Sequence, residues 1–324
     1  MPRAIRIHEA GGAEVMRLED VDVSGPDVGE VQVRHTAIGL NYIDVYDRSG
    51  LYPQSMPAGL GREGAGVVEA VGRQVRGFRV GDRVAYVHSV PGSYSERRNV
   101  PASRLVKVPA GVGDEQAAVL MLKGMTAAYL LRRTYRVKRH DVIVVHAAAG
   151  GVGLMLSQWG RALGATVIGI VGNEDKAKLA KKNGCRHVLV RGRDAVAGSV
   201  RKITRGVGAD VVYDAVGKDT FFESLDCLRK RGLMVNYGSA SGPAPPFSTA
   251  ELVKRGSLYV TRPTLFDYTA ERADLDSLAR ETFSAVKKKW VKVQIHQRYL
   301  LADATQAHRD LEARRTTGAS VILP

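Results

Sequence analysis

A glycine-rich turn follows a short apolar run in the segment "DVIVVHAAAGGVGLMLSQWG", residues 141–160. Small residues at Ala148, Gly150, Gly151 and Gly153 have the spacing of a dinucleotide-binding turn, which needs a tight bend and close helix–strand packing. A helix that begins at such a turn presents unpaired N–H groups and its positive dipole end, and both suit a pyrophosphate. The chemistry indicated is the binding of a dinucleotide cofactor.

The end of the next apolar run bears on the choice between NAD and NADP. NAD-preferring sites place an Asp or Glu there to hold the ribose 2′-hydroxyl. Here Gly172 ends the run, Lys176 follows one helical turn later, and Arg191 comes after the third strand. This pattern favours a 2′-phosphate and hence NADPH. An alternative involves Glu174 and Asp175, which either point outward as first-turn helix residues or turn inward to accept from a hydroxyl.

Metal and nucleophile chemistry have little support in the sequence. Two cysteines, Cys185 and Cys227, allow at most one disulfide and no four-cysteine zinc site, so we predict no metal and two unpaired core thiols. Among eight histidines, His146 lies beside the glycine turn and is the most site-like. No His, Cys or Asp cluster lies near it and no nucleophile elbow is present, so we interpret it as structural.

The elements that must position these residues change character along the chain. Residues 1–110 carry short valine-rich runs broken by Gly, Pro and Asp, which indicates small β-structure with turns. From about residue 115 the spacing becomes helical, and strands then alternate with helices expected over 174–183, 194–205 and 219–230, with a further strand near 256–265. Such alternation is typical of βαβ units and a parallel sheet. The tail most simply completes the first domain.

Composition and charge set broad limits. The chain has 324 residues, is 44% hydrophobic and has a formal charge of +15, which fits a two-domain enzyme. The basic residues are scattered, so we interpret them as a solvated surface, with attraction of a phosphorylated cofactor or of nucleic acid as alternatives. The N-terminus lacks an apolar run and no long uncharged stretch follows, so we expect no membrane span and a cytoplasmic location.

Several long motifs carry a resemblance to a known family. They are "GLNYIDVYDRSGLYP", "GREGAGVVEAVG", "GDRVAY", "GSYSE", "LKGMTAAYLL", "HAAAGGVG", "VVYDAVGKDTF", "CLRKRGLMV" and "YVTRP". With them the chain resembles, nearly end to end, the zeta-crystallin-type NADPH:quinone oxidoreductases of the medium-chain dehydrogenase/reductase superfamily. The resemblance implies an α/β protein with a GroES-like catalytic domain over 1–122 and 260–324. It also implies a Rossmann NADPH-binding domain over 123–259 and a cofactor in the cleft between the two.

The same resemblance implies particular site residues and a quaternary structure. It implies a homodimer joined along the Rossmann sheets, with "GSLYVTRP" (256–263) as the expected edge. The expected cofactor contacts are Asn41, Tyr46, Thr126, Tyr129, Gly150, Gly151, Val152, Gly153, Gly172, Lys176, Arg191, Val216, Ser239, Ser241, Phe266 and Arg314.

Two positions depart from related enzymes. Arg191 stands where close relatives have a tyrosine, and we predict that its guanidinium keeps or strengthens recognition of the 2′-phosphate. Arg62 stands where the zinc alcohol dehydrogenases of the superfamily carry a ligand histidine, and no cysteine precedes Cys185. Zinc-assisted polarisation of the substrate is therefore not expected.

Without a metal or a nucleophile, the protein would act by holding NADPH against an acceptor. The resemblance places Asn41, Tyr46, Tyr52 and Lys123 around the cleft, where we expect them to orient the substrate and stabilise negative charge on oxygen. An alternative for Tyr52 is a structural role in its turn. Quinone reduction is the expected activity. Reduction of the double bond of a 2-alkenal or enone is the alternative within the superfamily, and binding of A/U-rich RNA is an alternative of another class, as a second activity.

Overall fold

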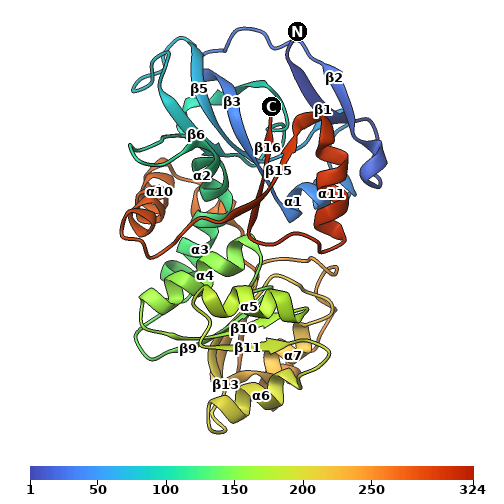
Figure 1. The fold of residues 1–324 in the computed structure, drawn as a ribbon, viewed down its shortest axis with the longest axis vertical. Coiled ribbons are helices and arrows are strands. Elements are labelled where there is room, and N and C mark those ends of the chain that lie inside the picture. The colour runs from blue at the N-terminus through green and yellow to red at the C-terminus, as the bar shows by residue number, and fades with distance from the viewer. The chain divides into compact units, whose positions relative to one another are not determined.

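The computed structural model describes the whole chain, Met1–Pro324, as two compact units shown in Figure 1. Unit 1 comprises Met1–Met125, Thr269–Phe283 and Val293–Pro324, and unit 2 comprises Thr126–Tyr268 and Ser284–Lys292. The sequence predicts domain boundaries after residues 122 and 259. In the structure, the first segment of unit 1 ends at Met125 and the first segment of unit 2 ends at Tyr268. Residues 284–292, expected in the β-rich domain, belong to unit 2.

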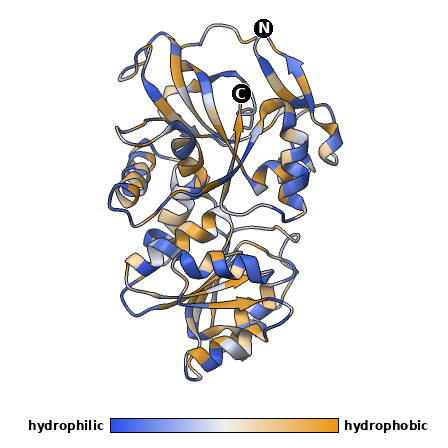
Figure 2. Ribbon diagram, viewed as in Figure 1, coloured by the Kyte–Doolittle hydropathy of each residue, from blue (hydrophilic) through white to orange (hydrophobic).

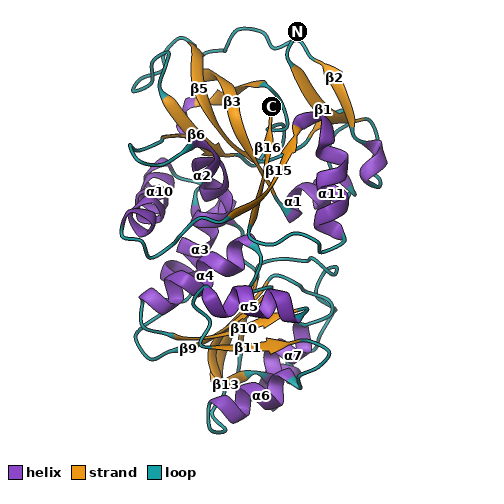
Figure 3. Ribbon diagram, in the orientation of Figure 1, coloured by secondary structure: helices purple, strands orange, loops and turns teal.

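Unit 1 is built on two β-sheets (Figure 3). A three-stranded sheet has the order β2-β1-β4, and a larger sheet has the order β15-β16-β3-β5-β6-β8 with β7 paired to β3. All pairs are antiparallel except β15 with β16. The strands are β1 (Arg3–Ile7), β2 (Arg17–Asp20), β3 (Glu30–Leu40), β4 (Ala58–Gly59), β5 (Glu63–Val71), β6 (Arg83–Val87), β7 (Arg97–Pro101), β8 (Leu105–Lys107), β15 (Ile295–Leu300) and β16 (Ala319–Leu323).

The alternation of strand β3 explains how this sheet buries its core. Val31 and Val33 are fully buried, while Arg34 is exposed, as expected for side chains that point alternately to opposite faces. The two valines pack with Val84 and Tyr86 of β6. The other elements of unit 1 include η1 (Ala13–Val15), α1 (Tyr42–Arg48), η2 (Ala102–Arg104), α2 (Asp114–Val119), η5 (Leu301–Asp303) and α11 (Ala304–Glu312). Helix α10 (Arg272–Lys287) begins in unit 1 and ends in unit 2.

The segment expected to be one helix after residue 115 is interrupted. Helix α2 is followed by the π-helical segment η3 (Leu120–Gly124), helix α3 (Met125–Tyr129) and a second π-helical segment, η4 (Leu130–Thr134). π-Helical turns inside α-helices are uncommon and are often found at functional sites. One of the expected site residues, Lys123, lies in η3.

Unit 2 contains a six-stranded sheet in which every neighbouring pair is parallel, with the order β11-β10-β9-β12-β13-β14. Because the chain goes from β9 to β10 and β11 on one side and to β12, β13 and β14 on the other, the order reverses beside β9. Ligands of doubly wound sheets bind at the carboxyl ends of the strands beside such a reversal. The strands are β9 (Val142–His146), β10 (Thr166–Val171), β11 (His187–Val190), β12 (Ala209–Asp214), β13 (Leu228–Asn236) and β14 (Tyr259–Thr261).

Helices cover both faces of this sheet. Figure 3 shows α4 (Gly151–Ala162) and α5 (Glu174–Lys182) on one face, and α6 (Val196–Ile203) and α7 (Phe221–Asp226) on the other. Figure 2 shows β10 as largely apolar and α5 as largely polar, which fits a buried strand and a surface helix. Two short helices complete the unit: α8 (Ala250–Lys254) and α9 (Leu265–Tyr268).

The α/β class and the parallel sheet predicted from the sequence are confirmed, while two helices are shorter than expected. The helix expected over 194–205 is α6, which covers only Val196–Ile203. The helix expected over 219–230 ends at Asp226, because Leu228 already pairs with Ala209 in the sheet. The strand expected near 256–265 is limited to β14. No helix of the chain has the length and apolar character needed to cross a bilayer.

Candidate functional site

The carboxyl edge of the parallel sheet gathers most of the expected cofactor contacts of unit 2. Each lies in the loop or helix start that directly follows a strand, so the sheet brings together segments far apart in sequence. They are Gly150, Gly151, Val152 and Gly153 after β9, Gly172 and Lys176 after β10, Arg191 after β11, Val216 after β12, and Ser239 and Ser241 after β13.

The turn after β9 has no room for side chains at its third glycine. A Cβ at Gly153 would lie 2.2 Å from the Ala147 carbonyl oxygen and 2.8 Å from Cα of Ala148, and both of these are backbone atoms. Ala147 has a positive φ of 50°, and Gly150 serves as the N-cap of α4 without a side-chain hydrogen bond. The twelve-residue helix α4 therefore begins against the sheet with its first N–H groups uncapped by side chains.

These features fit a dinucleotide. The backbone N–H groups and the positive dipole end at the start of α4 suit a pyrophosphate, and the bare glycines let it approach the backbone closely. The observation that supports the fit is the cradle at Gly153, which a Cβ would fill.

The segment after β10 carries Lys176 in the first turn of α5, and its two acidic side chains are exposed. Asn173 caps α5 by accepting from the Lys176 N–H at 2.9 Å. The side chains of Glu174 and Asp175 are 61% and 91% exposed; Glu174 pairs with Arg193, and Asp175 pairs with Lys178. Neither acid is buried at the edge of the sheet, which agrees with the outward alternative.

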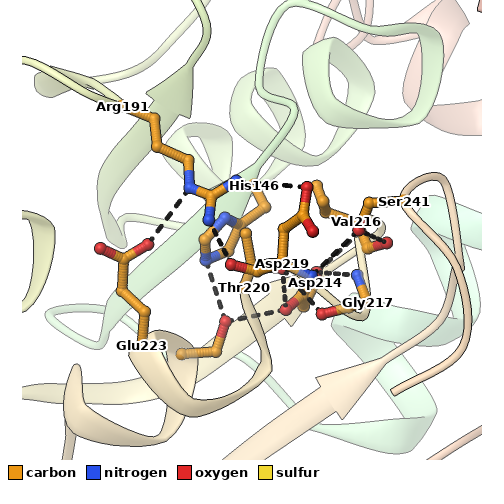
Figure 4. Close-up of polar contacts among 10 residues, drawn as sticks. His146, Arg191, Asp214, Val216, Gly217, Asp219, Thr220, Glu223 and Ser241 are labelled. Atoms are coloured by element: carbon orange, nitrogen blue, oxygen red, sulfur yellow. Dashed lines mark hydrogen bonds and ion pairs between the residues drawn. The ribbon is translucent and has the colours of Figure 1, made fainter. Parts of the chain in front are cut away.

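Arg191 lies between two carboxylates (Figure 4). Its guanidinium is 3.5 Å from Oε2 of Glu223 and 3.9 Å from Oδ2 of Asp219, and it also donates to the Asp219 carbonyl oxygen. The side chain is 36% exposed, so it stays accessible to a ligand. Sequence reasoning did not foresee these two acids as partners, because they follow 28 and 32 residues later in the chain.

Asp214, at the end of β12, organises the turn that carries Val216. Its Oδ1 accepts from the N–H groups of Val216 and Gly217 at 2.7 and 3.1 Å, and its Oδ2 accepts from Thr220 and Ser224, both at 2.8 Å (Figure 4). Asp214 and Ser224 are fully buried. Sequence reasoning gave Asp214 no role, although it lies within the quoted motif "VVYDAVGKDTF".

A further contact extends this network to the last strand of the site. Ser241 accepts from the Asp219 N–H at 3.0 Å and donates from its hydroxyl to the Val216 carbonyl oxygen at 3.0 Å. The loops after β12 and β13 are therefore joined to each other, and the buried carboxylate of Asp214 holds the first of them.

His146 belongs to the same buried network. Its Nε2 lies 3.0 Å from the Ser224 hydroxyl, which itself donates to Asp214. Nε2 therefore carries the proton and donates it to Ser224. Burial lowers the pKa of His146, although Asp214 opposes this shift. His146 is therefore buried in a hydrogen-bonded network, which agrees with its interpretation as a structural residue.

A second group of polar side chains lies in unit 1. Nζ of Lys123 donates to Oδ1 of Asn41 at 2.7 Å and to Oε1 of Glu63 at 3.0 Å, and the Asn41 amide donates to the same Oε1 at 2.9 Å. The side chains of Lys123 and Glu63 are 7% and 0% exposed. The structure thus brings together two of the expected catalytic residues and adds Glu63, which sequence reasoning had not assigned to the site.

Helix α1 sets the direction of the Asn41 side chain. Asp44 accepts from the Asn41 backbone N–H at 2.8 Å at the start of the helix, whereas the Asn41 amide turns to Glu63 and Lys123. Burial, with a smaller contribution from the neighbouring Asp47, raises the pKa of Asp44 to about 7. The hydroxyl of Tyr94 also donates to Asp44, at 2.9 Å.

Tyr46 and Tyr52 lie against each other in unit 1. Their rings are 5.4 Å apart in an edge-to-face arrangement, and the Tyr52 N–H donates to the Tyr46 carbonyl oxygen at 3.1 Å. Tyr46 is 8% exposed and Tyr52 is partly exposed. The turn contact and a substrate role for Tyr52 are therefore compatible with each other.

The remaining expected contacts are divided between the units. In unit 2, Thr126 and Tyr129 are buried on α3, and Tyr129 stacks on Tyr268 of α9 at 4.4 Å, in the same short helix as Phe266. Burial raises the pKa of Tyr129. Arg314 follows α11 in unit 1 with a positive φ of 59°.

The position that departs from the zinc enzymes holds an ion pair. Arg62 donates to both carboxylate oxygens of Asp47 at 2.6 Å, and both side chains are buried. No group of three or more His, Cys, Asp or Glu side chains in the chain could hold a metal ion. Both cysteines are unpaired and buried, and burial raises the pKa of Cys185 to about 11 and that of Cys227 to about 12.

Sequence families match both parts of the chain. Residues 27–110 match the alcohol dehydrogenase GroES-like domain, and residues 151–279 match the zinc-binding dehydrogenase family. The second match agrees with the dinucleotide fold of unit 2, although Arg62, paired with Asp47, stands where a zinc enzyme of the superfamily would carry a ligand histidine.

Individual relatives match over the full length. A quinone oxidoreductase of Pseudomonas aeruginosa is 48% identical over 325 residues, covering 100% of both chains. A 2-haloacrylate reductase of Burkholderia is 45% identical, covering 100% of this chain and 99% of its own. Among solved structures, an Escherichia coli quinone oxidoreductase complexed with NADPH is 45% identical with a TM-score of 0.97, covering 99% of this chain and 100% of that one.

Proposed function

Because the chain belongs to the zeta-crystallin-type quinone oxidoreductases of the medium-chain dehydrogenase/reductase superfamily, we propose that it reduces quinones with NADPH as the hydride donor. The family predicted from the sequence motifs is thereby confirmed. The observation that carries the proposal is the full-length identity with quinone oxidoreductases, one of which is solved with NADPH.

Unit 2 would hold the cofactor along the carboxyl edge of its sheet. The uncapped N–H groups at the start of α4 would bind the pyrophosphate, and the Gly153 cradle keeps that backbone accessible. Lys176 and Arg191 would bind the 2′-phosphate, and Val216, Ser239 and Ser241 would line the sheet edge beside it. When bound, NADPH supplies a hydride from its nicotinamide ring.

Unit 1 would supply the groups that meet the substrate. Lys123 has three N–H donors, of which two are engaged by Asn41 and Glu63, so one remains for a substrate oxygen. As a quinone accepts a hydride, negative charge develops on its carbonyl oxygen, and a fixed ammonium stabilises that charge. Tyr46 and Tyr52 would orient the quinone ring from the adjoining turn.

A second candidate reaction uses the same groups. Reduction of an activated carbon–carbon double bond also places negative charge on a carbonyl oxygen, and the 45% identical 2-haloacrylate reductase is the observation that favours it. Both reactions would need the Lys123 donor, so the site chemistry alone does not separate them.

The distinguishing experiment compares acceptors at saturating NADPH. We expect the purified protein to oxidise NADPH with a simple para-quinone at a kcat/KM at least tenfold above that with a short 2-alkenal or with 2-chloroacrylate. A larger kcat/KM for the alkenal or the haloacrylate would replace quinone reduction by double-bond reduction as the main activity.

We also propose a homodimer joined through the edge of the parallel sheet. Strand β14 pairs only with β13, and Tyr259 on it is 60% exposed. An unpaired edge of this kind can pair with a second copy of itself. Light scattering should give the mass of a dimer, and Val260→Pro, which interrupts the edge, should shift it to that of a monomer. A monomeric mass for the unchanged protein would contradict the proposal.

A further inference from the structure

One carboxylate contacts both the Lys123 ammonium and the other hydrogen-bond partner of that ammonium, Asn41. Oε1 of Glu63 accepts from Lys123 and from the Asn41 amide, while Oε2 accepts from the Leu122 backbone N–H at 2.6 Å. Glu63 thus contacts both the side chain of Lys123 and the residue that precedes it in the chain. These contacts span about 60 residues, from the first position of β5 to the π-helical segment η3.

The surrounding backbone is shaped to admit this carboxylate. A Cβ at Gly39, near the end of β3, would lie 2.1 Å from Oε1 and 2.5 Å from Cδ of Glu63. Gly39 has no positive φ, so the need for glycine there comes from space and not from backbone conformation. The Glu63 side chain therefore fills the volume that any larger residue at position 39 would need.

Glu63 is the acid that compensates the buried ammonium directly. An ammonium removed from water is costly unless an anion is hydrogen-bonded to it. The next acid, Asp44, contacts Asn41 and Tyr94 and has no hydrogen bond to Lys123, and its Oδ1 has no partner. Asp47 is engaged by Arg62. Of the acids around this site, Glu63 is therefore the one that can hold Lys123 in both charge and position.

We propose that Glu63 is the positioning residue of this site: it pairs with the Lys123 ammonium and fixes its remaining N–H, together with Asn41, for the substrate oxygen. This inference rests on the proposed function. The Glu63 side chain is fully buried and both of its oxygens are hydrogen-bonded to protein groups, so it acts through Lys123 and Asn41. The same role applies whether the acceptor is a quinone or an enone, because both develop charge on a carbonyl oxygen.

The test is a double-mutant cycle on the full-length protein. We expect Glu63→Gln to lower kcat with para-quinone by at least tenfold and to leave the NADPH dissociation constant, measured by nicotinamide fluorescence, within twofold. Lys123→Met should lower kcat by at least as much. Because Glu63 acts mainly through Lys123, the loss of kcat in the double variant should be far smaller than the product of the two single losses. Losses that multiply, or an unchanged kcat in either single variant, would overturn the proposal.

A second variant keeps the proposal testable should Glu63→Gln fail to fold. Gly39→Ala removes no charge but forces the Glu63 side chain to move, so kcat should fall while NADPH affinity stays close to that of the unchanged protein; the unfolding midpoint should also fall, because the displaced carboxylate is fully buried. The matched control is Gly25→Ala, since a Cβ at Gly25 meets nothing within 4 Å. An unchanged kcat in Gly39→Ala would contradict the role of Glu63.

The experiments distinguish failure of the proposed function from failure of the positioning role of Glu63. If the unchanged protein oxidises NADPH with neither quinone nor 2-alkenal, the proposed function fails and this inference fails with it. If it turns over with either acceptor and the Glu63 variants match it, the positioning role alone is wrong.

Discussion

Arg191 lies 3.5 Å from Glu223 and 3.9 Å from Asp219, so its guanidinium is held at the carboxyl edge of the parallel sheet by two acids. These contacts fix the side chain close to where a 2′-phosphate would bind beside Gly172 and Lys176. A dianionic phosphate is a stronger partner for a guanidinium than a partly exposed carboxylate, so it should compete successfully.

Arg191→Glu should therefore discriminate between the two cofactors. We expect the KM for NADPH to rise at least tenfold, because the phosphate loses a donor and meets a like charge, while the KM for NADH changes less than twofold. Steady-state kinetics with a para-quinone measure both. Arg186→Glu makes the same charge change on an exposed residue at the opposite end of β11 and is the matched control. An equal rise for NADPH and NADH would contradict the assignment of Arg191.

Asp214→Asn should destabilise the protein and weaken the cofactor loop. The carboxylate accepts hydrogen bonds from four donors in the buried network. An asparagine amide has only one oxygen, so it cannot accept all of them. We expect the free energy of unfolding to fall by about 1–3 kcal/mol and the KM for NADPH to rise. Urea denaturation measures the first effect. Asp226→Asn, at a carboxylate that is 47% exposed, should change stability by less than about 0.5 kcal/mol. Equal effects of the two variants would count against the network.

Two glycines at the sheet edge should respond differently to alanine. A Cβ at Gly153 collides with backbone atoms, so Gly153→Ala should lower the free energy of unfolding by about 1–3 kcal/mol. A Cβ at Gly172 meets nothing within 4 Å, so Gly172→Ala should leave stability unchanged and weaken only NADPH binding. Denaturation and cofactor titration of both variants separate the effects. Loss of stability in Gly172→Ala would show that Gly172 is needed for the fold and would contradict a role in cofactor binding alone.

Buried His35 should make the protein less stable in mild acid. Burial lowers its pKa to about 4, with a smaller contribution from Arg98; its Nδ1 donates to the Ser95 carbonyl oxygen, and its Nε2 lies 2.7 Å from the Tyr86 hydroxyl. The unfolded chain takes up a proton near pH 6.5, whereas the folded chain does so only near pH 4. The stabilisation is thus fully present above pH 6.5 and lost as the pH falls toward 4.

His35→Gln removes this proton uptake. Between pH 6.5 and 4, the slope of unfolding free energy against pH should be smaller in the variant by up to about 1.4 kcal/mol per pH unit. Other buried histidines, among them His146 and His308, remain in both proteins, so the difference isolates His35. Parallel slopes in the two proteins would contradict the neutral, buried state of His35.

The sequence predicts the parts of the fold that depend on local pattern. Alternating strands and helices predict the parallel sheet, and the spacing of Gly150, Gly151 and Gly153 predicts a turn at its carboxyl edge, because backbone geometry there depends on neighbouring residues. The sequence does not predict where the helix after Thr220 ends. That end depends on a long-range contact, because Leu228 pairs with Ala209 of a different strand.

The site is less predictable, because its polar contacts are long-range. Asn41 and Lys123 could be proposed only from family motifs, and Glu63, which holds both, lies about 60 residues from Lys123. Asp214 stands inside a quoted motif, but its partners become apparent only when the turn folds around it. Which charged side chains pair across such distances depends on the tertiary structure, and local sequence patterns do not predict it.

Cofactor and substrate choice can be measured together as the rate at which the purified protein oxidises NADPH, and separately NADH, with a simple para-quinone as acceptor. We expect rapid turnover with NADPH and a kcat/KM at least tenfold lower with NADH, because Lys176 and Arg191 are proposed to bind the 2′-phosphate that NADH lacks. Equal rates with the two cofactors, or no turnover of quinone despite NADPH binding, would contradict this expectation.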